Sequence, residues 1–251
     1  YLQFDGFDKE AYLKLRGDDL RNIKEKAIKN LKKYNFPIVL VATLQRGVNE
    51  HEIGKIIDFA LSDKVVKGIS FQPTTYCNRY ENHNPMDIIT VPEVINEIEK
   101  QTNKRILKSD FYPLPCPHPA CSFISYIFIK SNKEVITLSR VIDVDDYLDI
   151  FANKFFPEDY DVVVQKAINN LYSASAIPGS EKTMRSFCEA CGISFNFNQL
   201  KNRIKVISIM HFMDPYTFDL ERVKKCCIHE ILPEEKIIPF CVYNNLYRKN
   251  Q

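Results

Sequence analysis

Over residues 1–75, short apolar runs alternate with amphipathic helical patterns. The run Ile38–Leu44 fits a strand that is buried on both faces, and residues 1–4 and 68–72 supply two further strand patterns. Helical patterns lie between them: Asp18 or Asp19 can cap the first helix, and Asn49 opens the second. Strands that alternate with helices in this way predict βαβ units and a parallel sheet.

Polar segments follow each of these predicted strands. Asp5 comes after the first strand, residues 46–49 after the second and residues 73–80 after the third. Parallel α/β sheets place ligand sites beyond the C-terminal ends of their strands, so these segments are candidates for binding groups. A helix over residues 92–100 is expected next, with Thr90 as its cap and Glu93 completing a capping box.

After residue 109 the pattern changes to short strands, tight turns and cysteines, which divides the chain into residues 1–109 and residues 110–251. A hairpin is predicted from residues 122–130 and 134–141. The other predicted elements are helices over residues 144–154 and 160–174, a strand over 204–211, a short helix over 220–226 and a hairpin over 229–241.

The composition is close to that of ordinary soluble proteins. The chain has 251 residues, of which 45% are hydrophobic and 26% charged, and its formal net charge is +2. This balance does not indicate nucleic acid as a partner. No apolar stretch approaches the roughly 18 residues of a spanning helix, and the first residues lack a secretion signal, so we expect a cytoplasmic protein. The start lacks Met and reads as an interior cut.

Eight cysteines in a chain without an export signal favour metal ligation over disulfides. The candidate metal ligands are Cys116, Cys121, Cys188, Cys191, Cys226, Cys227 and Cys241. Thiolates two to four residues apart can reach one metal, and a hairpin can bring Cys241 back to Cys226 and Cys227. From spacing alone, structural zinc is slightly favoured over an iron–sulfur cluster, and inert buried thiols remain an alternative. Cys77 lacks such a companion and is interpreted as a spectator.

Other catalytic patterns are weak. The sequence contains no convincing Ser–His–Asp or Cys–His set and no GxGxxG or P-loop spacing, which disfavours hydrolases, kinases and dehydrogenases. His118, His211 and His229 lie near the cysteine groups in the sequence, but each is more readily interpreted as a packed or surface residue than as a ligand.

Several strings resemble parts of radical S-adenosylmethionine (SAM) proteins of the MoaA-like type. YLQFDGFDKEAYLKLRG resembles their fourth barrel strand and the loop after it, VLVATLQRGVNEHEIG the fifth strand, and GISFQPTTYCNRY the sixth. Further on, DFYPLPCPHPACS, HFMDPYTFDLERVKKCCIHE and IIPFCVYNN resemble the subgroup that contains the archaeal tetraether lipid synthases. The resemblance covers nearly the whole chain, and the combination is more specific than any single string.

The resemblance implies an α/β fold in which residues 1–109 form the C-terminal half of a partial (β/α)6 barrel, strands four to six. Residues 110–251 would form an α+β auxiliary iron–sulfur region. The CxxxCxxC loop that binds the SAM-cleaving [4Fe-4S] cluster in this family is missing, so the chain is not expected to be active alone.

By resemblance, the positions that face SAM are Gln3, Asp5, Arg16, Asn49 and Gln72. Asp5 could accept hydrogen bonds from ribose hydroxyls, and Arg16 could pair with the methionine carboxylate. From the residues alone, structural roles are favoured instead: a turn at Asp5 and Gly6, a solvated charge at Arg16 and a helix cap at Asn49.

The resemblance further implies an enzyme, or the larger part of one, that joins isoprenoid lipid chains by carbon–carbon bond formation. Its cofactors would be SAM and an auxiliary [4Fe-4S] cluster, and its lipid substrate would bring peripheral contact with a membrane. Two alternatives stay open: a radical SAM enzyme that acts on a peptide or cofactor precursor, and a non-catalytic zinc or iron–sulfur binding module. The missing N-terminal barrel part, or another chain, would cover the exposed sheet edge.

Overall fold

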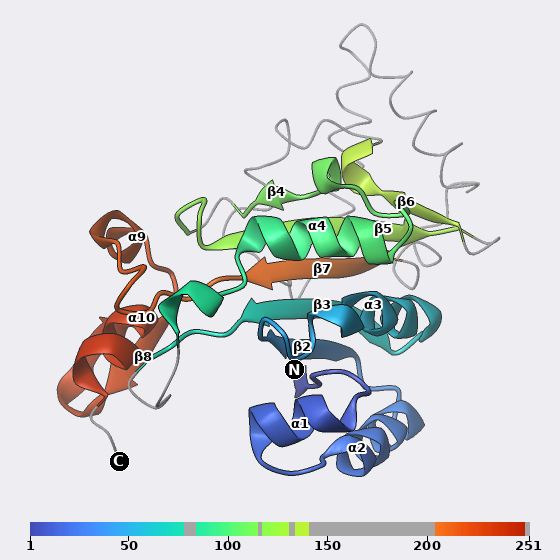
Figure 1. Ribbon diagram of the computed structural model, residues 1–251, viewed down its shortest axis with the longest axis horizontal. Coiled ribbons are helices and arrows are strands. Elements are labelled where there is room, and N and C mark those ends of the chain that lie inside the picture. The colour runs from blue at the N-terminus through green and yellow to red at the C-terminus, as the bar shows by residue number, and fades with distance from the viewer. Residues whose placement is uncertain (78–83, 115–116, 131–133, 141–203, 249–251) are drawn as a thin grey trace, which may run out of the picture.

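A computed structural model describes residues 1–77, 84–114, 117–130, 134–140 and 204–248, and these residues build one seven-stranded mixed sheet (Figure 1). The strand order is β1-β2-β3-β7-β5-β4, with β6 paired to β5. The parallel strands are β1 (Leu2–Gln3), β2 (Ile38–Leu44), β3 (Val66–Pro73) and β7 (Ile204–Met210). The antiparallel strands are β4 (Tyr112–Pro113), β5 (Ser122–Ile129) and β6 (Val135–Thr137). The predicted α/β class is confirmed, whereas a partial (β/α)6 barrel stays a prediction.

The main core lies between the sheet and two helices on one of its faces, α3 (Ile53–Ser62) and α4 (Val91–Gln101) (Figure 1). Ile56 of α3, Ile98 of α4 and Phe71 of β3 are fully buried in this core. Each such side chain contributes roughly 1.5–3 kcal/mol by leaving water. The hydrophobic face of the parallel strands therefore fixes the sheet against these helices.

The structure confirms most of the predicted elements. β2 has the predicted bounds, and α4 begins with the predicted capping box of Thr90 and Glu93. Helix α1 (Lys9–Arg16) was not predicted; Asp8 caps it by accepting a hydrogen bond from the backbone N–H of Glu10 at 3.0 Å. Helix α2 (Arg21–Lys33) has Leu20 as its N-cap, so the predicted caps were wrong, and Asp19 instead binds the backbone and guanidinium of Arg21.

The C-terminal elements lie beyond the ends of β3 and β7, at the left of Figure 1. They are α9 (Leu220–Lys224), β8 (His229–Leu232), β9 (Lys236–Pro239), α10 (Phe240–Val242) and a π-helical turn (Tyr243–Tyr247). The predicted short helix and hairpin are thus confirmed, with the hairpin turn at Pro233–Glu235. These elements place residues from the end of the chain next to the C-terminal edge of the sheet.

Two predictions are not decided by the fold. Strands from both sides of residue 109 share the seven-stranded sheet, and the division there stays a prediction. The helices predicted over residues 144–154 and 160–174 lie outside the described residues. Within the described part of the chain, no helix has the length and apolar character required to cross a membrane.

Candidate functional site

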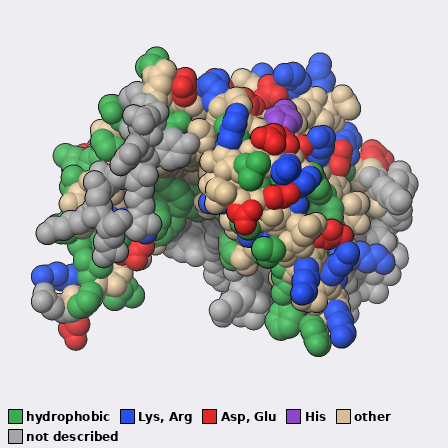
Figure 2. All heavy atoms as spheres, turned by 60° about the horizontal axis from the view of Figure 1, so that its bottom comes forward, with side chains coloured by type: hydrophobic (Ala, Val, Ile, Leu, Met, Phe, Trp, Pro, Cys, Tyr) green, Lys and Arg blue, Asp and Glu red, His purple; other side chains and the backbone are tan. Residues whose placement is uncertain are grey.

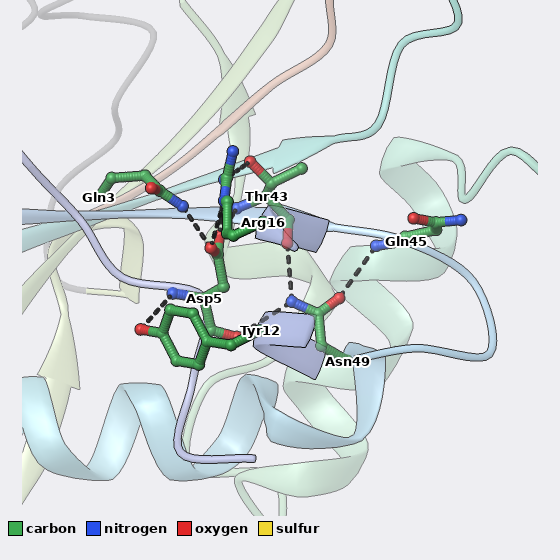
Figure 3. A network of polar contacts seen from close by, with 7 residues as sticks. All are labelled: Gln3, Asp5, Tyr12, Arg16, Thr43, Gln45 and Asn49. Carbon is green, nitrogen blue, oxygen red and sulfur yellow. Dashed lines mark hydrogen bonds and ion pairs between the residues drawn. The ribbon is translucent and has the colours of Figure 1, made fainter. Parts of the chain in front are cut away.

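Asp5 is the centre of a polar network where β1 ends (Figure 3). Its carboxylate is fully buried and accepts hydrogen bonds from Nε of Arg16 at 2.8 Å, Nη2 of Arg16 at 3.1 Å and the backbone N–H of Thr43 at 2.9 Å. The side-chain amide of Gln3 donates a further bond to it. A carboxylate offers about four acceptor positions, and here all are engaged within the protein.

Asn49 joins the ends of β1 and β2 in the same network. Its buried Nδ2 donates to the carbonyl oxygens of Asp5 at 3.0 Å and Thr43 at 2.7 Å, and its Oδ1 accepts from the backbone N–H of Gln45 at 3.0 Å. Asn49 does occupy the N-cap position of the short 3₁₀ turn Glu50–Glu52, but its side chain makes no capping bond there. The side chain therefore ties two strands together, and the helix-cap interpretation holds for the backbone position of Asn49 but not for its side chain.

The structure brings the five predicted SAM-facing residues to neighbouring strands. Gln3, Asp5, Arg16 and Asn49 share the network, and Gln72 of β3 lies opposite Thr43 in the strand register. Arg16 is an exposed residue, but its charge is partnered, because Asp5 and the Thr43 hydroxyl hold its guanidinium. A bond from Asp5 to a ribose hydroxyl would require one of its present bonds to open, and SAM binding at these residues stays a prediction.

Glu52 is a buried residue of this region that the sequence analysis missed. Its carboxylate accepts hydrogen bonds from the backbone N–H groups of Phe7 and, at 3.0 Å, of Asp8, and it pairs with Lys55 at 2.6 Å. Gly6 has φ +126°, and a Cβ atom there would lie 2.7 Å from Oε2 of Glu52. The Asp-Gly dipeptide indicated a tight turn, but the distant carboxylate that holds the turn left no local signal.

Beyond the ends of β3 and β7 lies a pocket of about 550 Å³, which we call the thiol pocket. Four cysteines line it, together with polar and aromatic side chains: Cys121, Cys226, Cys227, Cys241, Ser70, Gln72, Ser122, His211, Phe212 and Phe240. Figure 2 shows the surface hollowed between the C-terminal elements, at the left, and the charged surface of the rest of the chain, with hydrophobic side chains around the hollow. Segments far apart in the sequence thus meet in one pocket.

Four of the seven predicted metal ligands are therefore brought together. Cys116, Cys188 and Cys191 lie outside the described residues. Among the residues that the structure describes, no three His, Cys, Asp or Glu side chains are grouped closely enough to hold a metal ion. Soft thiol donors in a largely apolar pocket fit an iron–sulfur or zinc centre in their chemistry, although the described thiols are not already arranged around one.

Burial dominates the electrostatics of the thiols. It raises the pKa of Cys241; negative charge on Cys226 or Cys121 raises that pKa further, whereas the N–H of Met213 and the charge of Arg222 lower it. Burial also raises the pKa of Cys77 to about 11. Bound metal keeps thiols deprotonated, so it would reverse this preference for the neutral form.

Cys77 lies closer to the other cysteines than the sequence indicated. It lines a second, neighbouring pocket of about 240 Å³ together with Cys241, and its Sγ lies 3.7 Å from the carbonyl oxygen of Met213. Cys77 does not line the thiol pocket itself, and its interpretation as a spectator stays a prediction.

The chain resembles a curated relative over almost its whole length. It is 35% identical to the 7,8-dihydro-6-hydroxymethylpterin dimethyltransferase of Methanocaldococcus jannaschii, in a 284-residue alignment that covers 99% of this chain. This relative supports the radical SAM superfamily. It also supports SAM and iron–sulfur cofactors in general. The chain spans only 56% of the relative's length, and no family model matches it.

The prediction that the chain joins isoprenoid lipid chains was wrong. The relative's name describes methyl transfer to a pterin, which fits the alternative of a cofactor precursor better. The tetraether subgroup, and the membrane contact inferred from a lipid substrate, are not shown. The quoted strings carry strand ends and cysteine groups, and such features do not define the substrate of a radical SAM protein.

Proposed function

We propose that the chain is part of a radical SAM enzyme that transfers methyl groups to a pterin-type cofactor precursor. The observation that carries this proposal is the 35% identity to a pterin dimethyltransferase over 99% of the chain. When bound, SAM and an iron–sulfur cluster would supply the methyl group and the reducing electron. The described residues would bind and orient the substrate and exclude water from it.

The thiol pocket has features that suit a flat, polar heterocycle. Its volume of about 550 Å³ lies in the usual range for small-molecule sites. Phe212 and Phe240 pack with their ring centroids 4.8 Å apart at its wall, and Gln72 offers both an amide donor and an acceptor. These groups could cover the face of a pterin ring and bind its polar edge.

The hydroxyl of Ser122 is a specific group to which a substrate in the thiol pocket could bond. Ser122 is 1% exposed and lines the thiol pocket, and its Oγ has no hydrogen-bond partner within the described structure. A buried hydroxyl without a partner is unfavourable by about 1–3 kcal/mol, so a substrate that bonds to it recovers part of that free energy. We assign Ser122 as a substrate-binding residue.

The test uses the complete protein, purified and reconstituted with iron and sulfide without oxygen. It is incubated with 7,8-dihydro-6-hydroxymethylpterin, SAM and a strong reductant, and the products are followed by mass spectrometry. We expect pterin products that carry one or two added methyl groups. Bound metal with no methylated product would contradict the proposal and favour a non-catalytic metal-binding module.

Ser122→Ala tests the location of the substrate. We expect the KM for the pterin to rise about fivefold, the equivalent of one neutral hydrogen bond, with no loss of thermal stability. Ser62→Ala is the matched control, because this hydroxyl lies on the outer part of α3 and bonds to the carbonyl oxygen of Phe59. An unchanged KM in Ser122→Ala would exclude this binding position even if methylation is observed.

A further inference from the structure

Arg222 carries a buried positive charge, and no carboxylate of the described residues forms an ion pair with it. The residue lies in α9 and is 6% exposed. Its Nη2 donates to the carbonyl oxygen of His211 at 2.7 Å and its Nε to Sγ of Cys121 at 3.3 Å. Within the described part of the chain, no Asp or Glu pairs with it. The buried acids Asp5 and Asp110, by contrast, each pair with an arginine, and the buried Asp214 accepts hydrogen bonds from the backbone N–H groups of Tyr216 and Thr217.

A buried guanidinium raises the free energy of the folded state unless an anion lies close to it. A buried, unpaired ion is unfavourable by several kcal/mol, and one hydrogen bond to a carbonyl oxygen compensates only part of that cost. The buried Lys205 likewise forms no ion pair with a described residue, but burial lowers its pKa to about 8, so it can lose its proton. A guanidinium stays charged in proteins, and Arg222 therefore requires negative charge nearby.

The thiol pocket is the place where this charge can arise. Cys121 contacts Arg222 and lines the pocket with Cys226, Cys227 and Cys241. The positive charge of Arg222 also acts on Cys241, on another wall of the pocket. Thiolates that bind iron are anionic, so a centre held in this pocket would carry the negative charge that Arg222 lacks.

We propose that Arg222 is a positioning residue that balances the charge of a thiolate-bound iron–sulfur centre in the thiol pocket and raises its reduction potential. This inference rests on the proposed function, because it requires an iron–sulfur protein. A hydrogen bond to a ligand sulfur and a nearby positive charge both stabilise the more negative, reduced state of a centre. Arg222 supplies both through one guanidinium.

The test compares three variants of the complete, reconstituted protein: Arg222→Gln, Arg222→Lys and, as a control, Lys224→Gln. The control removes an equal charge from the same helix, but Lys224 is exposed and pairs with Glu221. Iron and sulfide are measured per chain. The reduction potential is then followed by EPR, using the signal that disappears in Cys121→Ser.

We expect a more negative potential in Arg222→Gln, a smaller shift in Arg222→Lys and no shift in Lys224→Gln. Should Arg222→Gln lose the centre, its retention in Arg222→Lys would still support the charge role. A full iron content with an unchanged potential in Arg222→Gln, or loss of the centre in both Arg222 variants, would overturn the inference. A wild-type protein that binds only zinc would instead refute the proposed function.

Discussion

Arg16 and Asp5 form a two-point ion pair where β1 ends, with Nε 2.8 Å from Oδ2 and Nη2 3.1 Å from Oδ1. The carboxylate is fully buried, whereas the side chain of Arg16 is 28% exposed. The pair links the first strand to the end of α1. Thr43 extends the link to β2, because it donates its backbone N–H to Asp5 and accepts from Arg16 through its hydroxyl.

Asp5→Asn should destabilise the protein. The substitution removes the charge that balances Arg16 and turns an acceptor-only group into one with an NH₂ that faces other donors, so we expect a loss of about 3 kcal/mol in the free energy of unfolding. Urea unfolding measures it. Asp18→Asn is the control, because Asp18 is exposed, and it should change the free energy by less than about 0.5 kcal/mol. Equal effects of the two substitutions would rule out a special role for the pair.

Gly6→Ala should be more damaging than Gly17→Ala. Both glycines have positive φ, +126° and +78°, so both substitutions strain the backbone by roughly 1–2 kcal/mol. Only at Gly6 does the added Cβ also meet Glu52, at 2.7 Å from Oε2, whereas no atom of the described residues lies within 4 Å at Gly17. Melting temperatures of the two variants compare them directly. A Gly6→Ala variant as stable as Gly17→Ala would contradict the close approach of Glu52.

Lys205 should make stability depend on pH. Burial lowers its pKa from the usual 10.5 of a lysine to about 8. Between these two values the unfolded chain holds a proton that the folded protein has released, so the free energy of unfolding rises with pH across this window. The rise should reach at most about 3 kcal/mol.

Lys205→Met removes the titrating group. The free energy of unfolding of this variant should therefore rise less between pH 8 and pH 10.5 than that of the wild type. Urea unfolding at several pH values measures the difference between the variant and the wild type. Lys26→Met, at an exposed position of α2, should keep the wild-type dependence. If the free energy of unfolding depended on pH in the same way in the wild type and in Lys205→Met, Lys205 would not be the source of the dependence.

Two cysteines that line the same small pocket should differ in metal binding. Cys241 also lines the thiol pocket, whereas Cys77 does not. We therefore expect Cys241→Ala to lose iron and Cys77→Ala to keep the wild-type iron and sulfide content after anaerobic reconstitution. Elemental analysis of iron and sulfide per chain compares the two variants. Iron lost equally from both variants would assign Cys77 as a ligand.

The sequence predicted the elements whose signals are local. The uninterrupted apolar run of β2, the capping box of Thr90 and Glu93, and the turn at Pro233–Glu235 each depend on neighbouring residues, and each was confirmed. Helix α1 was missed because its segment, KEAYLKLR, carries a weak apolar pattern and follows the Asp-Gly turn closely. Its cap at Asp8 is the signal that could have revealed it.

The residues that form the candidate site were only partly predictable from the sequence. Short spacings grouped the cysteines, but no local pattern could show that Cys121 would meet Cys226 and Cys241, because a strand pairing across the sheet brings them together. The contacts of Arg222 and Glu52 are likewise long-range. The substrate was predicted incorrectly because the resemblance carried cofactor-binding features, whereas substrate choice depends on side chains that line the pocket.

β7 lies between β3 and β5 although it follows both of them in the sequence. During synthesis, β3 and β5 therefore leave the ribosome before the strand that lies between them in the finished sheet. Until residue 210 emerges, each presents an unpaired edge, and the two could join each other in an order that the finished protein does not have. The sheet can therefore reach its final strand order only after translation has passed β7.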